Sequence, residues 1–166
     1  IEQIKKEDEE IRVVFSGSYE DKEENREIVI EEGIEEIAEN AFRDFQHLEK
    51  ITLPKSLKVI GVCAFCGCKN LKTVEVPSSV KVVSSNAFHG STVEQIVLNE
   101  GIEVLDGCSF WNVKTLKTIT IPSSVRRIEN QAFDGCGLES VILNEGLETI
   151  GNYVFQNCKN LKEIVI

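Results

Sequence analysis

The sequence predicts an α/β solenoid, in which stacked repeats share one parallel β-sheet along one side and carry short helical or 3₁₀ turns on the outer side. Two observations predict this fold class. A unit of 22 or 23 residues recurs six times from Ile28 onward, and every copy has a phenylalanine at the same position. Since a unit this short cannot bury its own apolar side chains, the copies must stack on one another.

Each unit opens with the same apolar–x–apolar triplet, and the unit boundaries follow from it. The units span residues 28–50, 51–73, 74–95, 96–118, 119–140 and 141–163, and residues 164–166 begin a seventh. The triplets are rich in β-branched residues, which predicts one strand per unit in the parallel sheet.

The segment after each strand has turn chemistry of two kinds. Some units have a proline-led turn and others a turn that ends in glycine. The proline-led turns begin at Pro54, Pro77 and Pro122, and the glycine-ended turns finish at Gly33, Gly101 and Gly146. A small residue followed by phenylalanine comes later in each unit, and this stretch is the expected helical or 3₁₀ turn.

The invariant phenylalanines predict an aromatic ladder in the core. Equivalent positions of stacked units lie one above another, so the six rings would stack inside the solenoid. The predicted structural core therefore contains Phe42, Phe65, Phe88, Phe110, Phe133 and Phe155.

The unit Ile119-Thr-Ile-Pro-Ser-Ser-Val-Arg-Arg-Ile-Glu-Asn-Gln-Ala-Phe-Asp-Gly-Cys136, followed by Leu138, resembles the BspA-like class of leucine-rich repeat. The resemblance implies a curved leucine-rich-repeat solenoid, with the parallel sheet on its concave face and the short turns on its convex side. It also implies a location on a microbial surface and binding of host or partner proteins. The chain departs from the pattern where Glu31, Asn99 and Asn144 replace the proline and where Phe45, Ser91 and Val113 replace the cysteine.

Two regions are expected, an acidic N-terminal cap segment at 1–27 and the solenoid at 28–166. The first region does not fit the repeat, and its strand-like stretch Ile11–Phe15 is expected to cover the edge of the first unit. Residues 1–10 are expected to form a short helix or a solvated tail. Because the chain contains no methionine, we expect it not to begin where translation began. Because it stops inside a strand, we expect the natural protein to continue with more repeats or another domain; a partner chain that covers this end is the alternative.

Composition excludes several classes of function. The net charge is −10, which argues against nucleic-acid binding because phosphate contacts need clustered lysine and arginine. No apolar run approaches the roughly 20 residues that span a bilayer. The two histidines, His47 and His89, occupy different positions of different units, and no catalytic motif is present. We therefore expect no catalytic residues and no cofactor.

The six cysteines fall into three positions of the repeat. Cys68, Cys136 and Cys158 share a position that Phe45 and Val113 fill elsewhere, which predicts buried free thiols. A disulfide between Cys136 and Cys158 on adjacent units is the alternative. The run of Cys63, Cys66 and Cys68 could suggest zinc, but no fourth ligand is evident, so no metal site is predicted.

Three outward columns of the predicted sheet are candidate surfaces. Charge alternates from unit to unit in the column that begins Arg26, Glu49 and Lys72, which predicts attractive pairs that stabilise the sheet. The neighbouring columns are small, polar or apolar, and they are the candidate partner-binding surface. The candidate residues are Thr52, Glu75, Val97, Thr120, Ile142, Val165, Gln95, Thr118 and Ser140.

The sequence thus predicts a non-enzymatic protein-binding or adhesion module, surface-exposed or secreted, that recognises a protein partner with the concave sheet. Candidate partners include a host extracellular or matrix protein. The alternative is a structural spacer or stalk that presents another domain.

Overall fold

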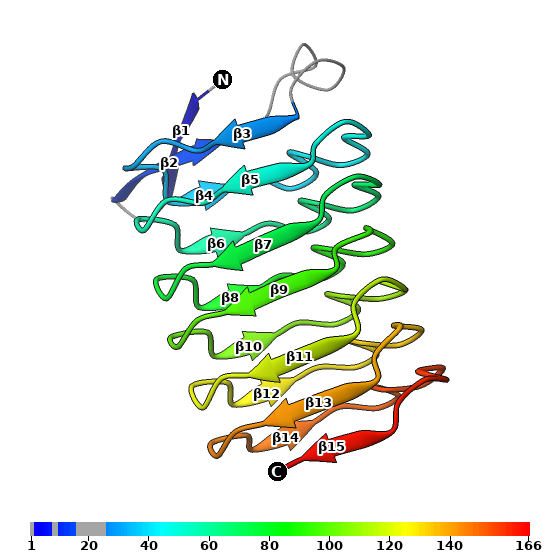
Figure 1. Ribbon diagram of the computed structural model, residues 1–166. Helices are drawn as coiled ribbons and strands as arrows, with labels where there is room; N and C mark the ends of the chain where they lie inside the picture. Colours follow the sequence, from blue (N-terminus) through cyan, green and yellow to red (C-terminus); the bar gives the residue numbers. More distant parts are fainter. Residues whose placement is uncertain (1, 8–9, 16–25) are drawn as a thin grey trace.

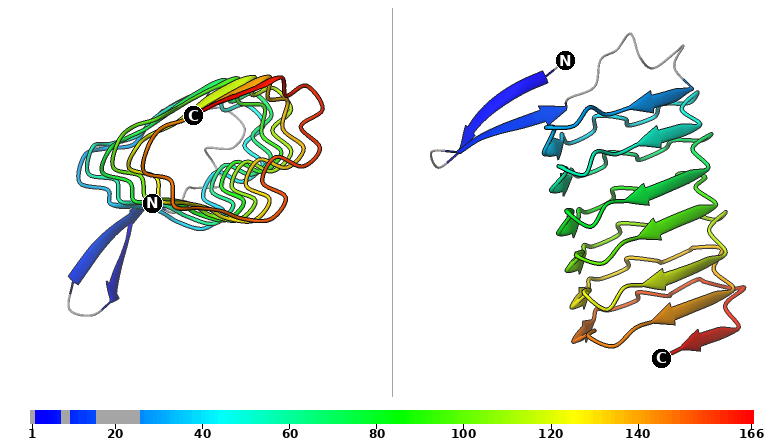
Figure 2. Two further views of the ribbon diagram at one scale, coloured as in Figure 1. Left: turned by 90° about the horizontal axis from the view of Figure 1, so that it is seen from below. Right: turned by 60° about the vertical axis from the view of Figure 1, so that its left-hand side comes forward.

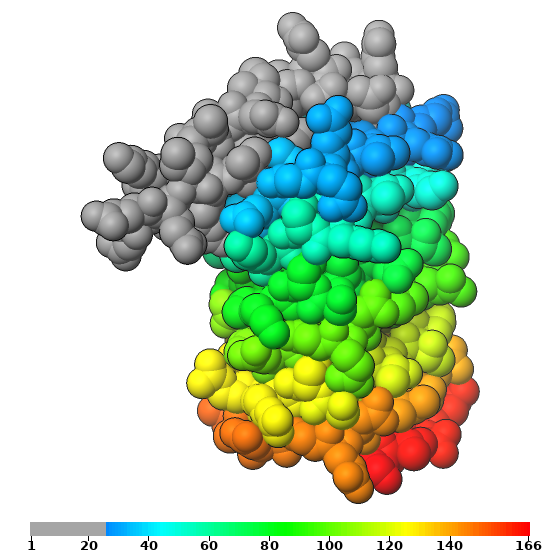
Figure 3. All heavy atoms as spheres, turned by 90° about the vertical axis from the view of Figure 1, so that its left-hand side faces the viewer, coloured from blue at the N-terminus to red at the C-terminus, as the bar shows by residue number. Residues whose placement is uncertain are grey.

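The computed structural model describes residues 2–7, 10–15 and 26–166 of the 166-residue chain. The repeats wind into a parallel β-solenoid of about six turns, with two rows of strands on opposite sides of each coil (Figures 1 and 2). Seen in space-filling form, the units lie as successive layers in sequence order (Figure 3). The predicted repeat solenoid is therefore confirmed.

The row predicted from the apolar triplets, which we call the front row, has one strand from each unit. Its strands are β3 (Glu27–Val29), β5 (Lys50–Thr52), β7 (Thr73–Val76), β9 (Gln95–Leu98), β11 (Thr118–Ile121), β13 (Ser140–Leu143) and β15 (Glu163–Val165). They form two parallel sheets, β3-β5-β7-β9 and β11-β13-β15, with β9 and β11 adjacent along the row (Figure 1).

A second row, the back row, was not predicted. It consists of the two-residue strands β4 (Glu36–Ile37), β6 (Val59–Ile60), β8 (Val82–Val83), β10 (Val104–Leu105), β12 (Arg127–Ile128) and β14 (Thr149–Ile150). These strands pair in parallel from unit to unit, and the second residue of each is buried in β4 to β12. Two residues are too few to show the alternation by which a strand is identified in sequence.

The expected helical or 3₁₀ turns on the outer side are wrong, because the described residues contain no helix. Successive backbone N–H groups alternate there between a local bond and a bond to the next unit. The Phe42 N–H donates to Ala64 O at 2.8 Å, whereas the Arg43 N–H donates to Asn40 O at 3.0 Å. A positive φ, 58° at Asn40 and 58° at Asp44, permits this alternation. Helices place no residue at positive φ, so the segment is a ladder of stacked turns, which we call the turn ladder.

The start of the chain is a hairpin. Strands β1 (Glu2–Glu7) and β2 (Glu10–Phe15) pair antiparallel, and β2 pairs in parallel with β4 through Val14↔Glu36 and Phe15↔Ile37. Residues 2–7 are thus a strand, neither a helix nor a solvated tail (Figure 2). Residues 16–25 of the expected cap segment lie outside the described residues.

The core between the two rows contains an aromatic stack among buried isoleucine, leucine and valine side chains. Neighbouring rings from Phe42 to Phe155 are 5.0–5.7 Å apart between centroids, and their planes lie within 12° of parallel. The first five rings are fully buried, and Phe155 in the last complete unit is partly buried. The stack fixes the vertical register of the units, so front-row side chains form straight columns.

Four of the attractive pairs that were predicted for the alternating charge column form between neighbouring strands. The pairs are Arg26–Glu49 at 2.5 Å, Lys72–Glu94 at 2.8 Å, Lys117–Glu139 at 3.8 Å and Glu139–Lys162 at 3.1 Å. All of these side chains are well exposed, so each pair adds little stability and mainly favours one register.

Candidate functional site: a groove on the front row

The candidate partner-binding residues all lie on the outward side of the front row. Thr52, Glu75, Val97, Thr120, Ile142 and Val165 occupy one column, and Gln95, Thr118 and Ser140 lie in the column beside it. All are exposed except Ser140, which is half-buried. The exposed fractions of Val97 and Ile142 are 52% and 42%, which is high for β-branched residues of a sheet.

One part of this surface is hollowed. A groove of about 890 Å³ runs across β5, β7 and β9 and continues over the turns that follow them. Its walls include Thr52, Glu75, Gln95 and Val97 from the strands, with Lys55 and Glu100 from the turns. The structure therefore brings four of the nine candidate residues together, whereas Thr120, Ile142, Val165, Thr118 and Ser140 lie outside the groove.

The position of the groove follows from how the two kinds of turn stack. Where a proline-led turn follows a glycine-ended turn, a serine joins them. Ser124 Oγ accepts from the Gly101 N–H at 2.8 Å and donates to Ile102 O at 2.7 Å. The same serine bridge connects the first two units, through Ser56, Gly33 and Ile34.

The reverse order, a glycine-ended turn after a proline-led turn, is held by different contacts. The Asn99 N–H donates to Val76 O at 3.3 Å, and the Asn144 N–H donates to Ile121 O at the same distance. The glycine is required here, because a Cβ on Gly101 would lie 2.0 Å from Ser78 O. A proline-led turn and a glycine-ended turn therefore stack tightly whichever of the two comes first.

Units two and three break this alternation, since both have proline-led turns. Pro77 has no N–H to donate, and Ser79 Oγ is buried without a hydrogen-bond partner among the described residues. Strands β5 and β7 pair through Lys50↔Thr73 alone within the described front row, whereas β7 and β9 pair through four residues each. The groove covers this junction and continues over β9 and the turn that follows it, so the two like turns form part of its floor.

The groove has mixed electrostatics. Lys50 Nζ lies 3.9 Å from Glu27 Oε2, and Glu75 Oε1 accepts a hydrogen bond from Asn99 Nδ2 at 3.0 Å. At the turn end, the Glu100 carboxylate accepts from the Ser123 and Ser124 N–H groups at 3.0 and 2.9 Å. The Ser123 N–H bond is the largest cause of the lowered pKa of Glu100, which remains ionised at neutral pH.

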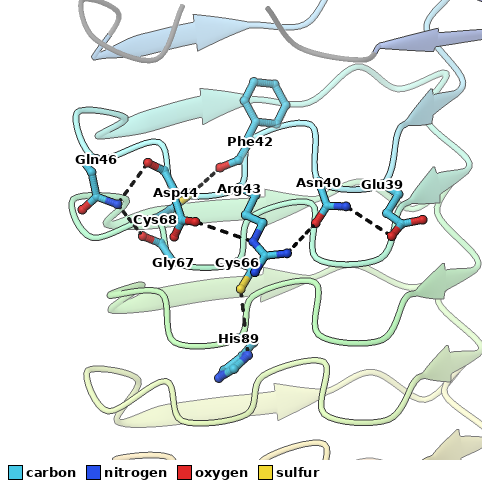
Figure 4. Close-up of polar contacts among 10 residues, drawn as sticks. All are labelled: Glu39, Asn40, Phe42, Arg43, Asp44, Gln46, Cys66, Gly67, Cys68 and His89. Atoms are coloured by element: carbon cyan, nitrogen blue, oxygen red, sulfur yellow. Dashed lines mark hydrogen bonds and ion pairs between the residues drawn. The ribbon is translucent and has the colours of Figure 1, made fainter. Parts of the chain in front are cut away.

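The thiols of the six cysteines lie in different surroundings. All six are free thiols, and the described residues contain no group of three or more His, Cys, Asp or Glu side chains placed to hold a metal ion. Cys68 Sγ donates to Phe42 O at 3.0 Å, away from Cys66 (Figure 4). Cys136 and Cys158 donate likewise to Phe110 O and Phe133 O. Burial raises the pKa of Cys68 and of Cys136 to about 12, so both act as small apolar groups with one hydrogen bond.

Several groove residues were missed by sequence reasoning. Lys50, Lys55, Pro77, Asn99 and Glu100 line it, and none was a candidate. The available signal was the pair of consecutive proline-led turns at Pro54 and Pro77, which is the only place where like turns adjoin in the six units.

Known repeat proteins resemble this chain in sequence and in structure. The family model "BspA type Leucine rich repeat region (6 copies)" matches residues 12–136 and 81–166. No match was found among curated proteins. Within the described residues, no helix has the length and apolar character needed to cross a membrane.

Solved structures of leucine-rich repeat proteins are similar. The T. pallidum protein TpLRR is 27% identical with a TM-score of 0.82, and the match covers 93% of this chain and 73% of that one. A Bacteroides ovatus protein is 26% identical with a TM-score of 0.82, over 100% of this chain and 51% of that one. The pneumococcal vaccine antigen PcpA is 26% identical with a TM-score of 0.55, and the match covers 85% of this chain and 39% of that one.

Proposed function

Because the chain belongs to the family of BspA-type leucine-rich repeat proteins, we propose that it is a protein-binding module whose partner docks in the front-row groove. Leucine-rich repeats are commonly protein-interaction modules. The observation that carries the proposal is the groove of about 890 Å³ at the junction of two like turns.

The chemistry of the groove supports a protein partner. Val97 offers an exposed apolar contact on β9, and the charged groups Lys50, Lys55, Glu75 and Glu100 line the same groove. Protein interfaces combine apolar contacts with polar and charged ones in this way. The strands below are held by the phenylalanine stack, so docking would order few protein groups and lose little free energy to entropy.

We also propose that the module is exposed on a cell surface or secreted, where a host extracellular or matrix protein is a candidate partner. The similarity to PcpA, which is described as a vaccine antigen, supports this location. A spacer or stalk that presents another domain is the second candidate. It is favoured by one observation, that β3 and β15 lie at opposite ends of the stack (Figure 1).

The test is a capture experiment with two matched variants. The protein, immobilised, is exposed to extracellular-matrix and serum proteins, and the proteins retained are identified by mass spectrometry. Val97→Glu alters the groove by placing a second carboxylate beside Glu75 on β7, so its melting temperature must be measured to show that the variant remains folded. Val82→Glu is the control on the back row, in the column where Glu36 is found.

A partner retained by the parent and by Val82→Glu but lost by Val97→Glu supports docking in the groove. Melting temperatures of both variants that equal the melting temperature of the parent establish that both are folded. If Val97→Glu retains the same partner, the groove is not the site. If nothing specific is retained by the parent, the spacer becomes the better proposal.

A further inference from the structure

Cys63 and Cys66 lie at the two ends of one turn in the turn ladder. The Cys66 N–H donates to Cys63 O at 3.1 Å, and Cys63 has a φ of 54°. A turn closed by this bond holds its end Cα atoms less than about 7 Å apart, and disulfides need about 4.4–6.8 Å. The backbone bond therefore brings the two Cα atoms to about the separation that a disulfide spans.

Side chains at these two positions meet in other units as well. In unit one, Arg43 Nη1 donates to Asn40 Oδ1 at 3.2 Å, and in unit five Gln131 Nε2 donates to Asp134 Oδ2 at 3.3 Å. The turn thus allows its first and fourth side chains to meet, as they do in units one and five. In unit two those side chains are both thiols, and the Cys63 thiol is close enough to Cys66 to contribute to the raised pKa of Cys66.

The two thiols are also reachable from solvent, unlike the other cysteine of the same unit. Cys63 and Cys66 are half-buried, whereas Cys68 is fully buried and its thiol donates to Phe42 O. Cys66 Sγ instead lies 3.9 Å from His89 Nδ1 on the next unit (Figure 4).

We propose that Cys63 and Cys66 are a redox-active dithiol that is oxidised to a disulfide by low-molecular-weight disulfide compounds. One thiol, as its thiolate, attacks a sulfur of the small disulfide, forms a mixed disulfide and releases one small thiolate. The second cysteine, as its thiolate, then attacks the protein sulfur of that mixed disulfide and releases the other small thiolate. The cysteines lose two electrons and two protons, and the small disulfide becomes two thiols.

The exchange is expected to be slow at neutral pH and faster in alkali. Burial, followed by the neighbouring Cys63 thiol, raises the pKa of Cys66, so little of it is thiolate near pH 7. Because the thiolate is the nucleophile, the rate increases as the pH rises toward that pKa. The site lies on the turn ladder and does not depend on the function proposed for the groove.

The test incubates the fully reduced chain with oxidised glutathione, in a series of ratios to reduced glutathione. Acid then stops the exchange, remaining thiols are alkylated, and tryptic peptides are analysed by mass spectrometry. Residues 59–69 form one tryptic peptide, which contains Cys63, Cys66 and Cys68. Three variants copy residues found at the equivalent position of other units: Cys63→Asn as in Asn86, Cys66→Gln as in Gln156, and Cys68→Ser as in Ser91.

We expect the parent peptide to lose two hydrogen atoms and to keep one alkylated cysteine, Cys68. Cys68→Ser should form the same disulfide at the same glutathione ratio, whereas Cys63→Asn and Cys66→Gln should form none. The proposal is overturned if only mixed disulfides with glutathione accumulate in the parent. It is also overturned if Cys63→Asn still forms an internal disulfide, or if Cys68→Ser abolishes it.

Discussion

Truncating the central ring of the phenylalanine stack, Phe88→Ala, should destabilise the chain strongly. Phe88 is fully buried, and its centroid lies 5.2 Å from that of Phe65 and 5.4 Å from that of Phe110. The backbone around it cannot close the cavity, because the Phe88 N–H is bonded to Ser109 O at 2.8 Å. We expect the free energy of unfolding to fall by about 3–5 kcal/mol, the cost of a buried phenylalanine truncation.

The same truncation at the end of the stack provides the control. Phe155 is only partly buried and has one ring neighbour, Phe133, at 5.7 Å. Since less apolar area is lost there, Phe155→Ala should cost less than about 3 kcal/mol. Urea unfolding followed by far-ultraviolet circular dichroism measures both changes, with the denaturant slope checked for constancy. Equal costs for the two variants would refute the argument that stacking on both sides holds the units together.

Three further predictions concern the turns and the thiols. Gly101→Ala should lower the urea midpoint of unfolding more than Gly33→Ala. A Cβ on residue 101 would lie 2.0 Å from Ser78 O, whereas a Cβ on residue 33 would meet nothing within 4 Å. Equal shifts of the midpoint would contradict the tight stacking of a glycine-ended turn on a proline-led turn. The stability that Glu100 contributes should be complete above its unfolded pKa of 4.5 and be lost as the pH falls through its lowered folded pKa. Glu100→Gln should therefore reduce the acid dependence of the melting temperature, and an unchanged acid profile would contradict this. Cys136, whose pKa is raised by burial to about 12, should be alkylated at pH 8 only after unfolding, and rapid labelling of the native chain would show that this position is open to solvent.

The stacking of the phenylalanine rings can be predicted from the sequence because the repeat places the same residue at the same core position of every unit. Phe65 and its equivalents recur at fixed spacing, and stacked units must superimpose them. The charge column is predictable for the same reason, since Lys72 and Glu94 become neighbours once the register is known. Both inferences need only the period of the repeat.

The turn ladder and the groove could not be predicted in the same way. The spacing of Ala64 and Phe65 suits a helical turn as well as stacked turns. What decides between them is the bond from the Phe65 N–H to Ala87 O on the next unit, which no local propensity reveals. The groove involves two successive turns of the same kind, at Pro54 and Pro77, and such a combination is not visible when each strand column is considered alone.

The pairing of unlike turns also governs how the chain can be shortened or recombined. Deleting unit four alone, residues 96–118, would place one proline-led turn on another and leave Ser124 Oγ without the Gly101 and Ile102 groups that it now bonds. Deleting unit three, residues 74–95, would restore strict alternation and remove the orphaned Ser79. For protein engineering, the exchangeable module is therefore a matched pair of repeats, and a single repeat can be moved only to a position with the same kind of turn.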